Sequence, residues 1–255
     1  MFLDDCEDLA YEIAFWTQGL EDPAYPLGEV GGLTREICSH LRSLGIMVLL
    51  SQGKSDRFLH NLMRSGKLRL AYLERVVREG QLQEHDFVSG VSEPLFDAIA
   101  AGDLALAAQI ADAAPAHHRP GHEYEDDHCY ARALRCLLQG RQTDADVAPL
   151  LARMEAFLGD PDDVRIGICR ALTGTDQLAF DEAFTAFLEA RTKAIEADEA
   201  RGELAEPPVL AQRLVYVDGL AMLRLAELRG FATDPDYLYC PSLARQPMVE
   251  PYPDV

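Results

Sequence analysis

The chain has little positive charge. Its 255 residues include 23 Lys and Arg against 43 Asp and Glu, which gives a net charge of −20 at neutral pH. Because phosphates need cationic partners, this balance disfavours direct nucleic-acid binding, and we predict none. The same charge favours solubility and would attract a basic protein partner. Positive charge is concentrated only in residues 35–78, which we expect to pair with acidic side chains of the N-terminal helix.

Signals for membranes, secretion and disulfides are missing as well. No apolar run reaches the ~18 residues that a membrane-spanning helix needs. The first ten residues, MFLDDCEDLA, are acidic where a secretory signal would be basic. The six cysteines include no CxxC pair, and Cys129 and Cys136 would stand ~10 Å apart on one helix, too far for a disulfide. We therefore expect a cytoplasmic protein with free thiols and no membrane contact.

The sequence also lacks the signatures of common enzymes. It contains neither a Gly-x-Ser-x-Gly turn nor a glycine-rich dinucleotide loop. Gly53-Lys54-Ser55 resembles the end of a phosphate-binding loop, but Val48 stands where that loop needs its first glycine. The acids beside Cys129 would raise the pKa of its thiol and lower its reactivity. A triad assembled from distant residues stays open.

A metal site is the sharpest catalytic alternative. Five neighbouring side chains look like metal ligands: His122, Glu123, Asp126, Asp127 and His128. Glu125-x-x-His128 matches half of a di-iron site, which requires a second Glu-x-x-His helix and two further carboxylates. No second Glu-x-x-His occurs in the chain. We therefore predict no metal, no cofactor and no catalytic residue, and we interpret these acids as the solvated start of a helix.

No segment shows the alternation typical of a β-strand, so the predicted fold class is all-α. The clearest helix lies within 122–140, HEYEDDHCYARALRCLLQG, where acids precede apolar residues spaced by three and four. Further helices are expected over five ranges: 3–20, 34–50, 57–79, 180–201 and 209–229. Prolines, glycines and polar residues predict connections over 21–32, 81–94 and 113–121.

A helix, a glycine and a second helix follow one another three times. Gly102, Gly140 and Gly174 break the copies, 38 and then 34 residues apart, and Asp103 and Asp176 stand where they would cap a second helix. Such periods are typical of stacked antiparallel helical hairpins, although an ordinary helical domain would also fit. We expect one compact unit made of three parts: an N-terminal helical segment over 1–90, the repeat-like hairpin array over 91–245 and an irregular tail over 246–255.

Four segments resemble the immunity protein 49 family: EYEDDHCYARALRCLL, QLAFDEAFTAFLEARTKAIEADEARG, VLAQRLVYVDGLAMLRLAELRG and YLYCPSLA. PLFDAIAAGDLALAAQIA is similar to the segment that precedes them, so the likeness covers about residues 90–245. The resemblance implies a mostly helical bacterial protein that binds a polymorphic toxin, such as a contact-dependent or type VI secretion effector, and so protects the producing cell. It implies no catalytic residues.

A basic toxin that acts on nucleic acid or nucleotides would be attracted to acidic surface. The acidic clusters within 123–127 and 196–206 give the predicted contacts: Glu123, Glu125, Asp126, Asp127, Glu196, Asp198 and Glu199. Each cluster alone is more simply explained as a solvated face. Tyr237, Leu238 and Tyr239 form an apolar alternative, because aromatic anchors dominate many interfaces. Two other functions stay open: a helical-repeat adaptor, and a metal-dependent enzyme using the acids near His122 and His128. The sequence does not indicate the oligomeric state.

Overall fold

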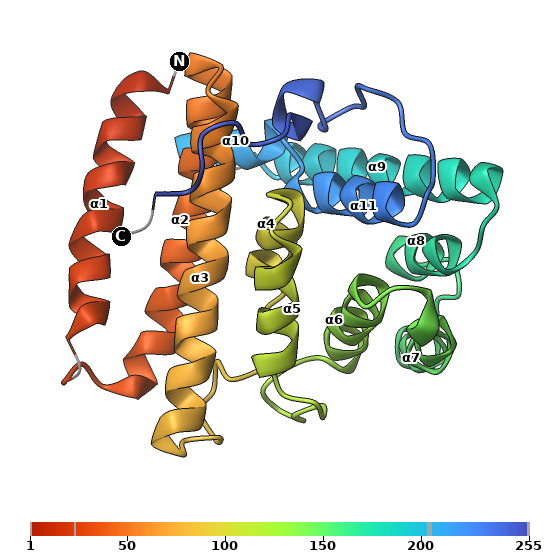
Figure 1. Ribbon diagram of the computed structural model, residues 1–255, viewed down its shortest axis with the longest axis horizontal. Helices are drawn as coiled ribbons and strands as arrows, with labels where there is room; N and C mark the ends of the chain where they lie inside the picture. Colours follow the sequence, from red (N-terminus) through yellow and green to blue (C-terminus); the bar gives the residue numbers. More distant parts are fainter. Residues whose placement is uncertain (1, 23, 203–205, 254–255) are drawn as a thin grey trace.

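The computed structural model describes residues 2–22, 24–202 and 206–253, and it confirms the predicted all-α fold (Figure 1). Within these ranges there is no β-strand, only the isolated bridges Pro120–Glu123 and Tyr237–Cys240. The α-helices are α1 (Leu3–Glu21), α2 (Leu27–Gln52), α3 (Ser55–Glu79), α4 (Glu93–Ala100), α5 (Leu104–Ala113), α6 (Glu125–Leu138), α7 (Asp144–Leu158), α8 (Val164–Thr173), α9 (Gln177–Ala200), α10 (Pro207–Leu214) and α11 (Val217–Leu228). Two 3₁₀ turns, η1 (Arg141–Thr143) and η2 (Ser242–Arg245), complete the elements.

Three long helices, α1, α2 and α3, stand side by side at one end of the molecule (Figure 1). The side chains that α1 buries are Phe2, Cys6, Leu9 and Ile13, whose spacing of three and four puts them on one helical face. This face packs on α2, and α2 packs on α3 along its length. The middle helix is therefore the most buried of the three, and α1 keeps its opposite face open.

The predicted connection over 21–32 is wrong in its second half, because α2 already begins at Leu27. Pro26 occupies the N-cap position in an extended conformation, where the lack of an N–H costs nothing. Gly31 does not interrupt the helix; it is needed for close packing. A Cβ at this position would lie 2.6 Å from Cβ of Asp86 and 2.8 Å from the Tyr72 hydroxyl, so only glycine lets this helix approach the loop after α3.

The three predicted hairpins are present as α4–α5, α6–α7 and α8–α9. Gly102 and Gly140 have φ of +81° and +87°, values that favour glycine. Asp103 accepts a hydrogen bond from the Leu106 amide, and Asp176 caps the start of α9 in the same way. The chain then returns: α11 packs on α4 and η2 on α3. This return joins the hairpins into one continuous core in place of an open stack.

The single helix predicted over 209–229 is in fact two, α10 and α11. The chain leaves the helical conformation at Val215, and the Tyr216 amide donates to the Tyr239 carbonyl at 2.8 Å. Gly219 of α11 allows Cys240 to pack closely, since a Cβ would lie 2.7 Å from its Sγ. Contact with the C-terminal segment thus divides a stretch whose apolar pattern is continuous.

A buried charge cluster joins α2, α4 and α11. The Arg42 guanidinium donates to Asp97 at 2.7 Å, to Asp218 at 3.0 Å and to the Glu93 carbonyl at 2.6 Å, and the Ser65 hydroxyl donates to Asp97 at 2.5 Å. Burial raises the pKa of Asp97 to about 6, although Arg42 opposes this. For Arg42, the expected pairing with the N-terminal helix is therefore wrong.

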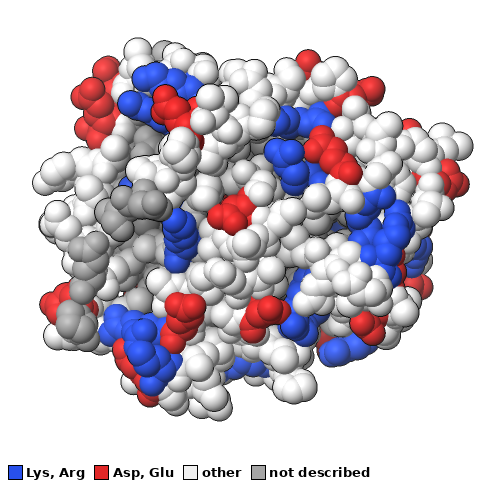
Figure 2. Space-filling model, viewed as in Figure 1, with Lys and Arg blue, Asp and Glu red and all other residues white. Residues whose placement is uncertain are grey.

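On the surface of the molecule, the face seen in Figure 2 shows basic and acidic side chains interspersed.

Candidate functional site

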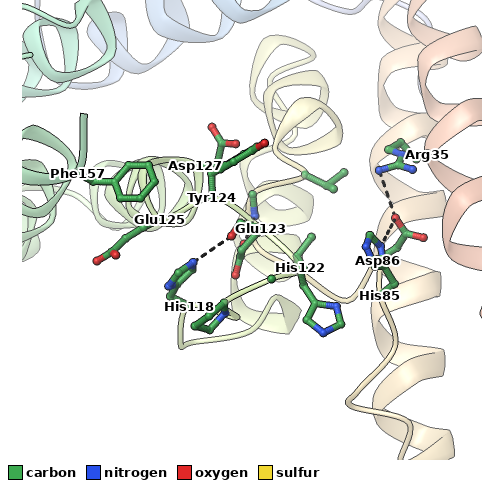
Figure 3. A pocket seen from close by; sticks show the side chains of 15 residues that line it. Arg35, His85, Asp86, His118, His122, Glu123, Tyr124, Glu125, Asp127 and Phe157 are labelled. Atoms are coloured by element: carbon green, nitrogen blue, oxygen red, sulfur yellow. Dashed lines mark hydrogen bonds and ion pairs between the residues drawn. The ribbon is translucent and has the colours of Figure 1, made fainter. Parts of the chain in front are cut away.

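A pocket of about 540 Å³ opens where the loop after α3, the loop before α6 and the end of α7 meet (Figure 3). Its lining residues are Arg35, His85, Asp86, Val88, Gly90, Val91, His118, Pro120, Gly121, His122, Glu123, Tyr124, Glu125, Asp127 and Phe157. The pocket thus forms around the acidic start of α6, and it includes three of the predicted contact residues.

Two arginines fix the loop that forms one wall of the pocket. Buried Arg69 donates to the carbonyls of Asp86 and Val88 at 3.1 and 2.7 Å, and Arg119 donates to the Glu84 carbonyl at 2.7 Å. Backbone carbonyls outside a helix or sheet need such donors when they are removed from water. Hydrogen bonds from these two arginines therefore hold the wall of the pocket in place.

Glu123 is bound inside the protein. Its side chain is only 3% exposed, and it accepts hydrogen bonds from the Ser89 hydroxyl (3.0 Å), the Gly90 amide (2.7 Å) and the Arg119 amide (3.2 Å). The His128 ring lies 3.5 Å from it. Burial alone would raise the pKa of Glu123, but the contacts with His128, Gly90 and Ser89 outweigh burial and lower the pKa. Through these hydrogen bonds, the carboxylate connects the segment just before α6 to the loop after α3.

The other acids of the cluster have arginine partners. Glu125 pairs with Arg153 at 2.7 Å, and Arg165 pairs with both Asp126 (2.7 Å) and Asp127 (3.1 Å). Asp126 is buried, whereas Asp127 is partly exposed at the pocket mouth. Burial and the neighbouring Asp126 raise the pKa of Asp127, and Arg165 opposes them. The start of α6 is thus less negative than its sequence alone indicates.

Histidines occupy the floor and rim without forming a metal site. The His118 Nε2 atom lies 3.1 Å from the Glu123 carbonyl oxygen, and the rings of His85 and His122 are 5.3 Å apart (Figure 3). The His128 ring instead faces the interior, with Nδ1 2.6 Å from the Ser89 hydroxyl. Among the described residues, no group of three or more His, Cys, Asp or Glu could hold a metal ion.

The remaining predicted contact residues lie outside the pocket. Glu196 and Glu199 are exposed near the end of α9, and Asp198 pairs with Arg201. The Tyr237 ring packs edge-on against Phe184 at 5.0 Å. Tyr239, at φ 63°, places its hydroxyl 3.3 Å from Thr192 of α9. Of the apolar alternative over 237–239, only Leu238 is strongly exposed.

Sequence patterns gave no sign that several of the pocket residues would meet. Arg35 of α2 lies 3.3 Å from Asp86 of the loop after α3, and both face the pocket (Figure 3). Phe157, near the end of α7, lines the opposite side of the pocket (Figure 3), and both it and Tyr124 are exposed. These residues meet only through tertiary packing, so no local pattern could have identified them. Exposed aromatic rings beside partly exposed carboxylates are suited to binding a cationic side chain.

None of the described helices combines the length and apolarity needed to cross a membrane. No curated protein and no solved structure matches the chain significantly. The family model for immunity protein 49, however, matches residues 56–244, from the start of α3 to η2. The match begins earlier than the resemblance predicted, and it includes both the pocket walls after α3 and the start of α6. The chain therefore belongs to the immunity protein 49 family.

Proposed function

We propose that the chain protects its producing cell by binding a cognate toxin directly in the cytoplasm. The observation that carries this proposal is the family match over residues 56–244, most of the chain. The toxin is a basic protein acting on nucleic acid or nucleotides, delivered by contact-dependent or type VI secretion. The large excess of acids supports such a partner, because it would speed encounter with a cationic surface.

In this proposal the pocket at the start of α6 receives an Arg or Lys side chain of the toxin. Tyr124 and Phe157 offer exposed rings that a cation can stack on, and Asp127 offers a partly exposed carboxylate at the rim. Because the walls are held by Arg69 and Arg119, binding orders little of the chain. The chain contributes no catalytic group, and inhibition follows from occupying the toxin's cationic cleft.

The proposal is tested by producing the chain together with the toxin encoded by the adjacent gene. Growth should be restored, and the two proteins should co-purify. The double variant Tyr124→Ala/Phe157→Ala should weaken both results, whereas Leu178→Ala, which removes an exposed apolar side chain from α9, should leave both unchanged. If the toxin neither co-purifies nor becomes harmless in the presence of the wild-type chain, direct neutralisation is wrong.

A further inference from the structure

The outer face of α1 exposes large aromatic side chains. Tyr11 is 74% exposed and Phe15 58%, and their spacing of four places them on the same side of the helix. Trp16, the only tryptophan of the chain, is 42% exposed, and its ring lies edge-on against Phe15 at 5.2 Å. Leu3, two turns earlier on the same helix, is also exposed, with the exposed acids Glu7 and Asp8 between it and Tyr11. We call this surface the α1 face.

Within the part of the chain that the structure describes, the aromatic side chains of the α1 face stay exposed. The helix packs on α2 through its opposite side, and α2 is the neighbour with which it makes its main contacts. Single exposed apolar residues are common, but three aromatic rings gathered on one helix form a patch of the kind that marks an interaction site. The helix also precedes residues 56–244, so this surface lies outside the part of the chain that the family model matches.

The charges carried by α1 itself have one sign. Residues 1–34 contain no Lys or Arg, and the exposed acids on this helix include Asp4, Glu7, Asp8 and Glu12. No ion pair joins these four carboxylates to another described residue, in contrast to the acids at the start of α6. Along the edge that α1 forms, Figure 2 shows mostly uncharged surface, with acidic side chains toward both ends.

We propose that the α1 face is a second docking surface for the toxin, where it enters an apolar groove rimmed by Lys and Arg. This inference rests on the proposed function and adds a contact outside the family-matched region. Helix-in-groove recognition uses anchors spaced as Tyr11 and Phe15 are, and unpaired carboxylates beside them select a basic rim. A second copy of the chain would bring like charges together, and anionic lipid would repel the same carboxylates.

The lone tryptophan allows a direct test. The full chain is labelled with 5-fluorotryptophan, so that Trp16 gives a single fluorine resonance, and the unlabelled toxin from the adjacent gene is added. Formation of the complex is followed separately by gel filtration. The resonance should shift and lose its sensitivity to exchange of H₂O for D₂O, because docking removes the ring from water.

The outcomes separate this inference from the proposed function. A complex on gel filtration with an unchanged Trp16 resonance would overturn the docking surface and leave direct binding intact. Absence of any complex would overturn both. A shift that depends on chain concentration without toxin would identify a second copy as the occupant and contradict the proposal.

Substitutions in the α1 face provide a second test, in which the affinity for the toxin is measured. Tyr11→Ala/Phe15→Ala should raise the Kd for the same toxin at least about thirtyfold, as expected when interface hot spots are removed. Asp8→Lys/Glu12→Lys should slow association, and the effect should shrink as salt rises. The control Leu178→Ala removes a side chain of similar exposure (65%) on α9 and should leave the Kd unchanged. Equal Kd values for the control and for Tyr11→Ala/Phe15→Ala would refute the proposal.

Discussion

The Nε atom of Arg42 lies 2.7 Å from Oδ1 of Asp97, although 55 residues separate the two in the chain. Both side chains are almost fully buried. A buried charge is stabilised by its ion-pair partner, because removing one residue of the pair leaves the other charge without solvent or a counter-ion. This pair therefore fixes the N-terminal helices to the first hairpin of the family-matched region.

Arg42→Ala should lower the free energy of unfolding by about 3–5 kcal/mol, because it leaves the buried Asp97 and the partly buried Asp218 without their cation. The matched control is Arg170→Ala, which removes an exposed pair with Glu155 and should cost less than about 1 kcal/mol. Urea denaturation followed by circular dichroism measures both. Equal losses for the two variants would contradict the structural role of the Arg42 cluster.

Gly31→Ala should destabilise the fold by about 1–3 kcal/mol, because the new Cβ would lie 2.6 Å from Cβ of Asp86. Gly167→Ala provides the control, since a Cβ in the middle of α8 would meet no atom within 4 Å. That substitution should stabilise the protein by about 0.5–1 kcal/mol through helix propensity. Thermal unfolding compares the two, and a neutral Gly31→Ala would show that α2 does not approach the loop this closely.

The glycines and acids of the hairpins show what local sequence can determine. Gly102, Gly140, Asp103 and Asp176 were identified as breaks and caps because a turn and a cap depend on a few neighbouring residues. The helical turn over 27–32 was missed because Gly31 serves a contact with Asp86, far along the chain.

Long-range contacts also explain the other differences. The division between α10 and α11 was missed because it depends on the bond from Tyr216 to Tyr239, which apolar spacing does not reveal. At the candidate site, the acidic cluster over 123–127 is visible in the sequence, but its arginine partners are not. Arg153 and Arg165 reach them from later helices, so the expected free charge is only partly neutralised.

Glu123→Gln should lower stability at pH 7 by about 1.5–3 kcal/mol, because the amide removes the charge and puts a donor where one carboxylate oxygen accepts hydrogen bonds. The folded pKa of Glu123 lies below its ordinary value, so its stabilising contribution is present above that ordinary value and is lost as pH falls through the folded pKa. The difference in the free energy of unfolding between wild type and variant should therefore become smaller as the pH falls.

Urea unfolding from pH 7 down to pH 3 measures this narrowing. Glu189 is exposed on α9, so the stability difference between Glu189→Gln and wild type should not depend on pH. A gap for Glu123→Gln that stays constant across this range would mean that the carboxylate is not held in its charged form.

Asp127→Asn should slow association with the toxin while changing dissociation little, because a partly exposed rim charge acts mainly on encounter. Its effect should fade in high salt, since the screening length is about 8 Å at physiological ionic strength. Surface-based kinetics at several salt concentrations measures both rates. The reverse pattern, with an unchanged association rate and faster dissociation, would place Asp127 inside the contact instead of at its rim.

Direct contact between the chain and its toxin is the central claim, and titration calorimetry of the two purified proteins tests it most directly. The toxin from the adjacent gene, inactivated at its own catalytic centre, is titrated with the full chain. We predict a saturable binding curve, weakened by Tyr124→Ala/Phe157→Ala and unchanged by Leu178→Ala. A wild-type chain that protects cells from the active toxin yet gives no binding to the purified protein would contradict neutralisation by direct contact.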